Sequence, residues 1–311
     1  MRILFMGTPD FALFSLRALV DAGEEIIGVV TQPDKPKGRK YILTPPPVKV
    51  YAMEQGIPVF QPTTLRNEAF YQCLTELNPD LIVVAAYGKI LPANVLSYPK
   101  HGCVCVHGSL LPEYRGAAPM QRAIIDGKSE AGITTMLMDE GIDTGDMLLR
   151  GSIQIEENDN FETVHDKLGE CSVKVLLDTL KEIGNGTLKP IKQDDSCASY
   201  AAKIENADCV LDFSGSAKSV HDRIRGLSPI PLAFTHTPDG KLLKVIASEL
   251  SAHLSDGAKP GEVIALSNGK ITVACGDGAI DLLVILPEGK KRMNAADFIN
   301  GRRINVGDVL A

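Results

Sequence analysis

The feature that most constrains the fold is a regular alternation of short apolar runs with segments of helical periodicity over the first 200 residues. Apolar runs at 2–6, 26–31, 59–61, 81–86, 104–107 and 133–138 read as buried strands. Residues 11–22, 47–54, 68–77, 117–126 and 161–183 carry apolar side chains at helical spacing. This alternation predicts an α/β, Rossmann-like domain whose mostly parallel sheet is covered by helices on both faces.

The remainder of the chain shows a different pattern. After one expected helix at 214–225, apolar runs at 241–247, 262–266, 271–275 and 280–286 are separated by the turn sequences Pro-Asp-Gly, Asn-Gly and Gly-Asp-Gly. Short strands at near-regular spacing predict a small, OB-like β-barrel. Because residues 184–208 have few apolar side chains and no clear period, we expect a first domain over 1–189, a linker over 190–208 and a second domain over 209–311.

Composition excludes several classes of protein. With 44% hydrophobic and 23% charged residues, the chain has globular rather than disordered composition. No apolar run approaches the roughly 18 residues of a membrane-spanning helix, so no membrane partner is expected. Seven cysteines without regular spacing favour a reducing cytoplasm over a disulfide framework. The net charge of −7 argues against nucleic acid as a partner, but the surplus acid is local, since residues 1–50 carry more basic than acidic side chains.

Three familiar kinds of ligand site lack their sequence pattern. A dinucleotide-binding domain would carry Gly-x-Gly-x-x-Gly after the first strand, where this chain has Gly7 alone and Pro9 without an N–H. No phosphate-binding P-loop sequence occurs. Cys103 and Cys105 lie between two histidines, but no second pair with ligand spacing follows, so no metal site is expected.

The exit from the expected strand at 104–107 is the most informative segment. His107 ends this strand, and ligands of open α/β sheets bind at such carboxyl ends. Cys105, two residues earlier, lies on the same face. An imidazole here suits proton transfer near neutral pH. A partly buried His that supports the turn is the simpler alternative. A carboxylate of the loop at 138–146 would orient the imidazole if the two loops meet.

Five segments, in order along the chain, resemble the signature sequences of the methionyl-tRNA formyltransferase family: MGTPDFA at 6–12, QPDKPKGR at 32–39, AYGKILP at 86–92, VHGSLLPEYRGAAP at 106–119 and GIDTGD at 141–146. The resemblance covers essentially the whole chain and weakens after about residue 205. It implies an enzyme of translation initiation that transfers a formyl group from 10-formyltetrahydrofolate to the α-amino group of methionine on initiator tRNA.

The same resemblance implies roles for individual residues. His107 fits the position of the histidine that handles the amine proton, and Asp143 fits the aspartate that orients and supports that imidazole. The segment that lines the folate site corresponds to Ser109, Leu110, Leu111 and Pro112.

One residue departs from the family pattern. The family has Asn where this chain has Cys105, and a thiol is a weaker hydrogen-bond donor than an amide. Three interpretations are open: the enzyme works with donors from the backbone or His107, it is an impaired or repurposed homologue that binds tRNA or folate, or Cys105 is a nucleophile beside His107. A related folate-dependent formyltransferase or hydrolase acting on a small amine or on water is a further alternative. The intact remaining segments favour the first interpretation.

Four positive charges fall within six positions, at Lys35, Lys37, Arg39 and Lys40. Prolines and a glycine between them exclude a helix, so an exposed loop is expected, and a solvated basic loop is the simpler interpretation. The family carries a basic insertion loop here that enters the acceptor-stem end of tRNA, with Arg39 at the key arginine position. The resemblance therefore implies tRNA binding by this loop, with tRNA and folate as partners of a monomer.

Overall fold

The structure is a computed structural model that describes residues 1–37, 41–253 and 257–311. Unit 1 comprises Met1–Gly116, Ala131–Ile153 and His165–Tyr200. Unit 2 comprises Ala117–Glu130, Gln154–Val164 and Ala201–Ala311. Within the described ranges, no helix has the length and apolar character needed to cross a membrane.

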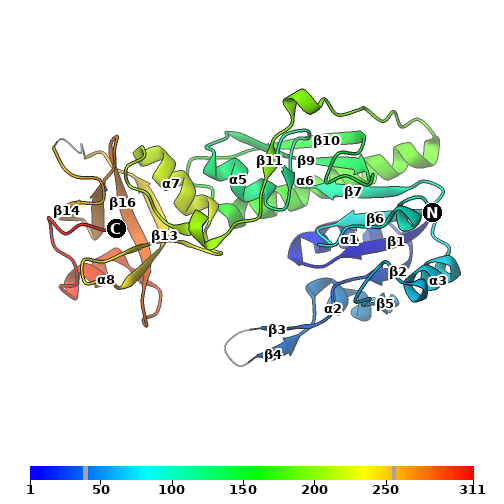
Figure 1. Ribbon diagram of the computed structural model, residues 1–311, viewed down its shortest axis with the longest axis horizontal. Coiled ribbons are helices and arrows are strands. Elements are labelled where there is room, and N and C mark those ends of the chain that lie inside the picture. Colours follow the sequence, from blue (N-terminus) through cyan, green and yellow to red (C-terminus); the bar gives the residue numbers. More distant parts are fainter. Residues whose placement is uncertain (38–40, 254–256) are drawn as a thin grey trace. The chain divides into compact units, whose positions relative to one another are not determined.

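Unit 1 is built on a mostly parallel sheet, which confirms the expectation from the strand–helix alternation (Figure 1). In the described part of the chain its strands follow the spatial order β10 (Met147–Gln154), β9 (Glu130–Leu137), β7 (Cys103–His107), β6 (Leu81–Ala85), β1 (Arg2–Gly7), β2 (Glu25–Val30) and β5 (Val59–Phe60). The pairs β1–β2, β1–β6, β2–β5 and β6–β7 are parallel, whereas β9 runs antiparallel to β7.

The helices that accompany this sheet are α1 (Asp10–Asp21), α2 (Pro47–Glu54), α3 (Glu68–Leu77), α4 (Ala93–Leu96) and α6 (Phe161–Asn185). Local signals explain where α2 and α3 begin and end. Pro47 occupies the first turn of α2, where its missing N–H costs nothing. The Asn67 side chain accepts the Phe70 N–H at 3.0 Å, and Asn78 ends α3 in the left-handed conformation that Asn tolerates. Both helices keep the bounds that the sequence predicts.

The core of unit 1 forms where β1 and β6 pack against α3. Every residue of β6 is buried, and Phe70 and Leu74 of α3 join the same cluster. Full burial of one such side chain contributes about 1.5–3 kcal/mol. At the end of β1, a Cβ on Gly7 would lie 2.7 Å from the Ala12 Cβ and 2.9 Å from the Ala85 carbonyl oxygen. Gly7 therefore serves the close approach of β1 and α1.

Two short strand pairs complete unit 1. β3 (Lys35–Lys37) and β4 (Ile42–Thr44) form an antiparallel hairpin that extends beyond the main sheet in Figure 1. Large apolar side chains are exposed on it at Tyr41, Ile42 and Leu43. β8 (Arg115–Gly116) pairs with β11 (Tyr200–Ala201), at whose first residue unit 1 ends. The 3-10 turn at Asp195–Cys197 lies in unit 1, and the one at Asn206–Cys209 lies in unit 2.

Unit 2 is an antiparallel sheet with three helices among its described residues. The strands are β12 (Ala233–His236), β13 (Leu242–Leu250), β14 (Val263–Ser267), β15 (Lys270–Ala274), β16 (Ala279–Pro287) and β17 (Met293–Asn294). The helices are α5 (Pro119–Ile125), α7 (Ala217–Gly226) and α8 (Ala295–Asn300). Hairpin turns fall where the sequence predicts them. Between β14 and β15, for example, Asn268 and Gly269 adopt φ of 53° and 74°, the positive values that tight hairpin turns favour.

The second sheet is confirmed, but a closed barrel of paired strands is not found in the part of the chain that the structure describes. The strand order β12-β13-β16-β15-β14 leaves β12 and β14 as the outer strands. The last residues of the chain hydrogen-bond beside both. The His236 N–H of β12 donates to the Ala311 carbonyl at 2.7 Å, and the Leu310 N–H donates to the Gly261 carbonyl, just before β14, at 2.8 Å.

Candidate active site

The candidate site lies at the carboxyl edge of the sheet in unit 1. The chain runs from β1 outward to β2 and β5 and then returns to β6 on the other side of β1, so the order of strands reverses between β1 and β6. Ligands of open α/β sheets bind at such a reversal. Thr8 and Gln32 both donate from their side chains to the Tyr87 carbonyl at 3.1 Å, which ties the ends of β1, β2 and β6 together. β7, which ends at His107, is the next strand along.

His107 is buried, with 6% of its surface exposed, and both ring nitrogens face acceptors. Nε2 lies 3.0 Å from the Tyr114 carbonyl oxygen. Because a carbonyl only accepts, Nε2 carries the proton of this hydrogen bond. Nδ1 lies 3.6 Å from Asp143 Oδ2. The structure therefore brings together the histidine and the aspartate that the sequence places 36 positions apart.

Asp143 is held in an unusual backbone conformation. Its φ is 55°, in the left-handed region that residues other than glycine rarely adopt. Its Oδ2 accepts the Gly116 N–H at 2.8 Å. A Cβ on Gly145, two residues later, would lie 1.7 Å from the Leu137 carbonyl oxygen, so the loop can pass β9 only with glycine there. The glycine at position 145 and the bond from Gly116 thus both help to present the Asp143 carboxylate to His107.

Cys105 lies beside this pair in an apolar cluster with Leu111, Met136 and Met147. Burial raises the pKa of its thiol, and the negative charge of Asp143 raises it further. Burial also raises the pKa of Cys103, to about 12. A reactive cysteine needs a lowered pKa, because the thiolate is the nucleophile. This environment disfavours the interpretation in which Cys105 attacks the substrate.

The segment expected to line a folate site forms a rigid turn after β7. The Ser109 hydroxyl donates to the Glu113 carbonyl at 2.6 Å. The Thr134 hydroxyl accepts the Leu111 N–H and donates to the Ser109 carbonyl, at 3.1 and 2.7 Å. Leu110 and Pro112 are half-buried and keep some surface, whereas Ser109 and Leu111 are buried. Contact of these four residues with folate stays a prediction.

The predicted basic loop is only partly described. Lys35 is exposed on β3, and the backbone of Lys37 ends the same strand. Arg39 and Lys40 lie outside the described residues. Among the described residues, no hydrogen bond or ion pair joins Lys35 to His107 or Asp143. Partial burial lowers the pKa of the Lys89 ammonium, and the positive charge of Lys35 lowers it further.

Arg115 also belongs to the site, although neither periodicity nor spacing in the sequence indicates it. Its guanidinium is buried, with 2% of the residue exposed, and donates to Gln193 Oε1 at 3.0 Å and to Asp195 Oδ1 at 2.8 Å. The one local signal that could have indicated its role is its place in a segment rich in Gly and Ala. Gln193 and Asp195 gave none, because they lie in a polar stretch without periodicity.

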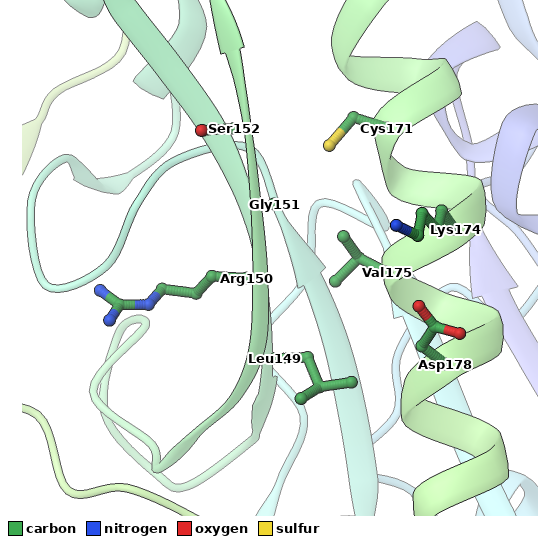
Figure 2. A pocket seen from close by; sticks show the side chains of 8 residues that line it. All are labelled: Leu149, Arg150, Gly151, Ser152, Cys171, Lys174, Val175 and Asp178. Carbon is green, nitrogen blue, oxygen red and sulfur yellow. The ribbon is translucent and has the colours of Figure 1, made fainter.

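A separate groove of about 390 Å³ lies between β10 and α6 (Figure 2). Its lining residues are Leu149, Arg150, Gly151, Ser152, Cys171, Lys174, Val175 and Asp178. None of the predicted site residues lines it. Figure 2 shows the Arg150 side chain directed away from the α6 side chains. In the parts of the chain that are described, no group of three His, Cys, Asp or Glu side chains is arranged to hold a metal ion.

Comparisons with known proteins identify the family of the chain. The family described as "Formyl transferase" matches residues 1–180, and "Formyl transferase, C-terminal domain" matches residues 203–303. The methionyl-tRNA formyltransferase of Bacillus subtilis is 47% identical over 310 residues, which is 99% of this chain and 97% of that protein. That of Caldanaerobacter subterraneus is 47% identical over 311 residues, with both chains fully covered.

Solved structures show the same fold at low sequence identity. The sugar 3N-formyl transferase WlaRD aligns with a TM-score of 0.67 at 18% identity, over 94% of this chain and 99% of that one. The methionyl-tRNA formyltransferase from Clostridium thermocellum aligns with a TM-score of 0.55 at 16% identity, over 81% of this chain and 94% of that one.

The sheet, the strand-end histidine and the matched families define a two-part formyl transferase. The relatives that are 47% identical over almost the full length are methionyl-tRNA formyltransferases, one family within this class. The chain belongs to the methionyl-tRNA formyltransferase family.

Proposed function

We propose that the protein transfers a formyl group from 10-formyltetrahydrofolate to the α-amino group of methionyl initiator tRNA, in the cytoplasm and as a monomer. The observation that carries the proposal is the identity of 47% to methionyl-tRNA formyltransferases over 99% of the chain. The His107–Asp143 pair supports it, because formyl transfer to an amine requires groups that move a proton and stabilise an oxyanion.

The residues at the end of β7 suit 10-formyltetrahydrofolate as co-substrate, because His107 offers an N–H and Leu110 and Pro112 keep some surface. When bound, this folate supplies the formyl group. The transfer forms a bond from the amine nitrogen to the formyl carbon and breaks the bond from that carbon to the folate nitrogen. The amine loses a proton and the leaving nitrogen gains one, so the reaction needs a group that holds and passes protons. His107, with a proton held at Nε2 and a carboxylate beside Nδ1, is such a group.

His107 handles that proton in two ways in this proposal. Its Nε2–H, which donates to the Tyr114 carbonyl in this structure, is the donor for the formyl oxygen as negative charge develops there. The imidazole first receives the proton that the amine loses and then gives a proton to the leaving nitrogen, so it ends the turnover neutral, as it began. Asp143 faces Nδ1 and stabilises the ring while both of its nitrogens carry protons. Cys105, neutral because its pKa is raised, adds apolar surface rather than a strong donor. Ser109, Leu110, Leu111 and Pro112 form the wall of the folate site.

Binding of tRNA is assigned to the basic loop and the second domain. Lys35, Lys37, Arg39 and Lys40 contact phosphates of the tRNA, and the exposed Tyr41 offers a ring on the same hairpin. Formyl transfer belongs to the domain at 1–189 and tRNA binding to the domain at 209–311, with a linker at 190–208. In this proposal the residues at 309–311 complete an OB-like barrel by hydrogen-bonding beside β12 and β14.

The decisive experiment supplies the purified protein with 10-formyltetrahydrofolate and methionyl initiator tRNA and measures formylmethionyl-tRNA. We expect turnover with the charged tRNA and none with free methionine or other small amines. His107→Ala should abolish it. Turnover on a small amine, or tight binding of tRNA without turnover, would contradict the proposal.

Salt dependence tests the basic loop. Alanine at all four basic positions should reduce the salt slope of tRNA binding by about one for each phosphate that the variant no longer neutralises. Alanine at Lys174 and Lys181 of α6 is the matched control and should leave the slope unchanged. An unchanged slope in the loop variant would contradict phosphate binding there.

A further inference from the structure

The loop that carries Asp143 is fastened by a side chain from a distant part of the chain. The Gln193 Nε2 amide donates to the Asp143 carbonyl at 2.8 Å and to the Gly145 carbonyl at 2.7 Å. These two bonds use both N–H groups of the amide. Gln193 lies 50 residues after Asp143, in the polar stretch that follows α6.

Arg115 fixes which way the Gln193 amide points. The Arg115 Nε donates to Gln193 Oε1 at 3.0 Å, and Arg115 is almost fully buried. A guanidinium only donates, so the amide oxygen must face Arg115 and the amide nitrogen must face the two carbonyls. Asp195 Oδ1 accepts from the other end of the guanidinium at 2.8 Å. The orientation of Gln193 is therefore set by a buried cation.

Asp143 is held twice by the same short strand. Its carboxylate accepts the Gly116 N–H of β8 directly, at 2.8 Å. Its carbonyl is held through Gln193 by the side chain of Arg115, the preceding residue of β8. A residue other than glycine at φ 55° persists only where its surroundings over-determine it. Together, Arg115, Gln193, Asp143 and Gly116 form a closed ring of contacts.

We propose that Gln193 is a positioning residue for catalysis: it holds Asp143 in the left-handed conformation that directs the carboxylate at His107. The inference rests on the proposed function, in which His107 and Asp143 act together. In this role Gln193 acts through the backbone of Asp143, to whose carbonyl it donates, and not on the substrate. A displacement of about 1 Å in a group that orients a reacting side chain costs up to about 100-fold in rate.

Gln193→Glu is the sharpest variant. Glutamate keeps an oxygen for Arg115 and removes both donors, and it sets a carboxylate oxygen against the two carbonyls. We expect kcat for formyl transfer to fall about 10- to 100-fold while KM for the folate and the tRNA stays within about twofold. Gln193→Met keeps the length without a donor and should show the same split. Gln72→Ala, an exposed glutamine of α3, is the matched control and should keep the kcat of the unmodified protein.

A double-mutant cycle separates positioning from general destabilisation. In an Asp143→Asn background, Gln193→Glu should cause no further loss of kcat, because the carboxylate that it positions is already gone. Full additivity of the two losses would overturn the proposal. Equal changes in kcat and KM, or loss of rate only in proportion to unfolded protein, would overturn it as well.

Amide exchange reads the position of Asp143 without any activity. The Gly116 N–H is protected by the Asp143 carboxylate, so its exchange should quicken at least tenfold in Gln193→Glu and Gln193→Met and stay unchanged in Gln72→Ala. If the unmodified protein transfers no formyl group but Gly116 exchange quickens, the proposed function fails and the positioning role stands. Unchanged Gly116 exchange in both Gln193 variants overturns the positioning role, whatever the activity.

Discussion

The replacement of Asp143 by asparagine isolates the charge that faces His107. Asparagine has nearly the same shape as aspartate, and its carbonyl oxygen can still accept the Gly116 N–H that the carboxylate accepts at 2.8 Å. The change therefore removes a negative charge 3.6 Å from His107 Nδ1 and leaves the loop in place. The fold should be unaffected, and the loss should fall on catalysis.

The expected loss follows from that distance. Two unit charges 3.6 Å apart attract by about 4–5 kcal/mol at an effective dielectric constant near 20. The separation is too long for a good hydrogen bond, and 18% of the Asp143 side chain is exposed, so roughly half of this energy is available to a charged imidazole. At about 1.4 kcal/mol per factor of ten, a loss of 2–3 kcal/mol slows formyl transfer about 30- to 150-fold.

Single-turnover formylation of methionyl-tRNA, with thermal unfolding alongside, measures this directly. Asp139→Asn is the matched control, because Asp139 belongs to the same loop and its hydrogen bonds with described residues stay within that loop, to Gly141 and Thr144. It should keep the rate within about threefold. The reasoning is refuted if Asp143→Asn turns over at the unmodified rate, or if Asp139→Asn slows the reaction equally.

Three further predictions concern Cys105, Gly145 and His221. Cys105→Asn should raise the formylation rate up to about 100-fold by supplying an amide donor, and should lower the free energy of unfolding by about 1–3 kcal/mol. Cys103→Asn is the control and should only destabilise the fold. A Cys105→Asn protein that is folded but slower would contradict the donor argument. Gly145→Ala places a Cβ 1.7 Å from a backbone oxygen, so urea unfolding should show about 1–3 kcal/mol less stability, together with slower transfer. Burial lowers the pKa of His221 below 6.5, so the folded protein binds fewer protons at this ring than the unfolded chain does. The free energy of unfolding should therefore fall as the pH drops below about 6.5. His221→Gln should flatten that part of the pH profile, measured by urea unfolding.

The neutral state expected of His221 agrees with its hydrogen bonds. Its Nε2 faces the Glu157 carbonyl at 3.2 Å and must donate, while Nδ1 lies 3.0 Å from the Ser248 hydroxyl and can accept from it. A second proton on the ring would displace the serine hydrogen. A pH profile with the same slope in His221→Gln would show that other groups cause the acid sensitivity.

Local signals were enough to predict most elements of the fold. The fully apolar run of β6 and the end signals of α2 and α3 are contained in neighbouring residues, so periodicity finds them. The Asn268-Gly269 turn is equally local. The hydrogen bonds beside β12 and β14 are different, because they depend on residues at 309–311 meeting segments far back in the chain.

The site shows the same division. His107 could be predicted from its place at a strand end. Its contact with Asp143 was implied only by the family resemblance and not by the strand pattern, because β9 runs antiparallel to β7 and pairs Leu137 with Val104 rather than with His107. The loop after β9 must turn back to reach the histidine. Gln193 is beyond sequence reasoning of this kind, since its role arises only when the stretch after α6 comes to lie on that loop.

The hydrogen bonds of the last residues also bear on how copies of the protein behave toward one another. Unpaired outer strands of a sheet are templates for pairing with another molecule. Ala311 exchanges backbone hydrogen bonds with His236 of β12, and Asp308 and Leu310 bond to Val263 of β14 and to Gly261 just before it, so the residues at 308–311 cover part of both edges. A chain shortened by residues 309–311 would uncover backbone groups beside both strands at once, and its characteristic failure would be self-association rather than simple loss of activity.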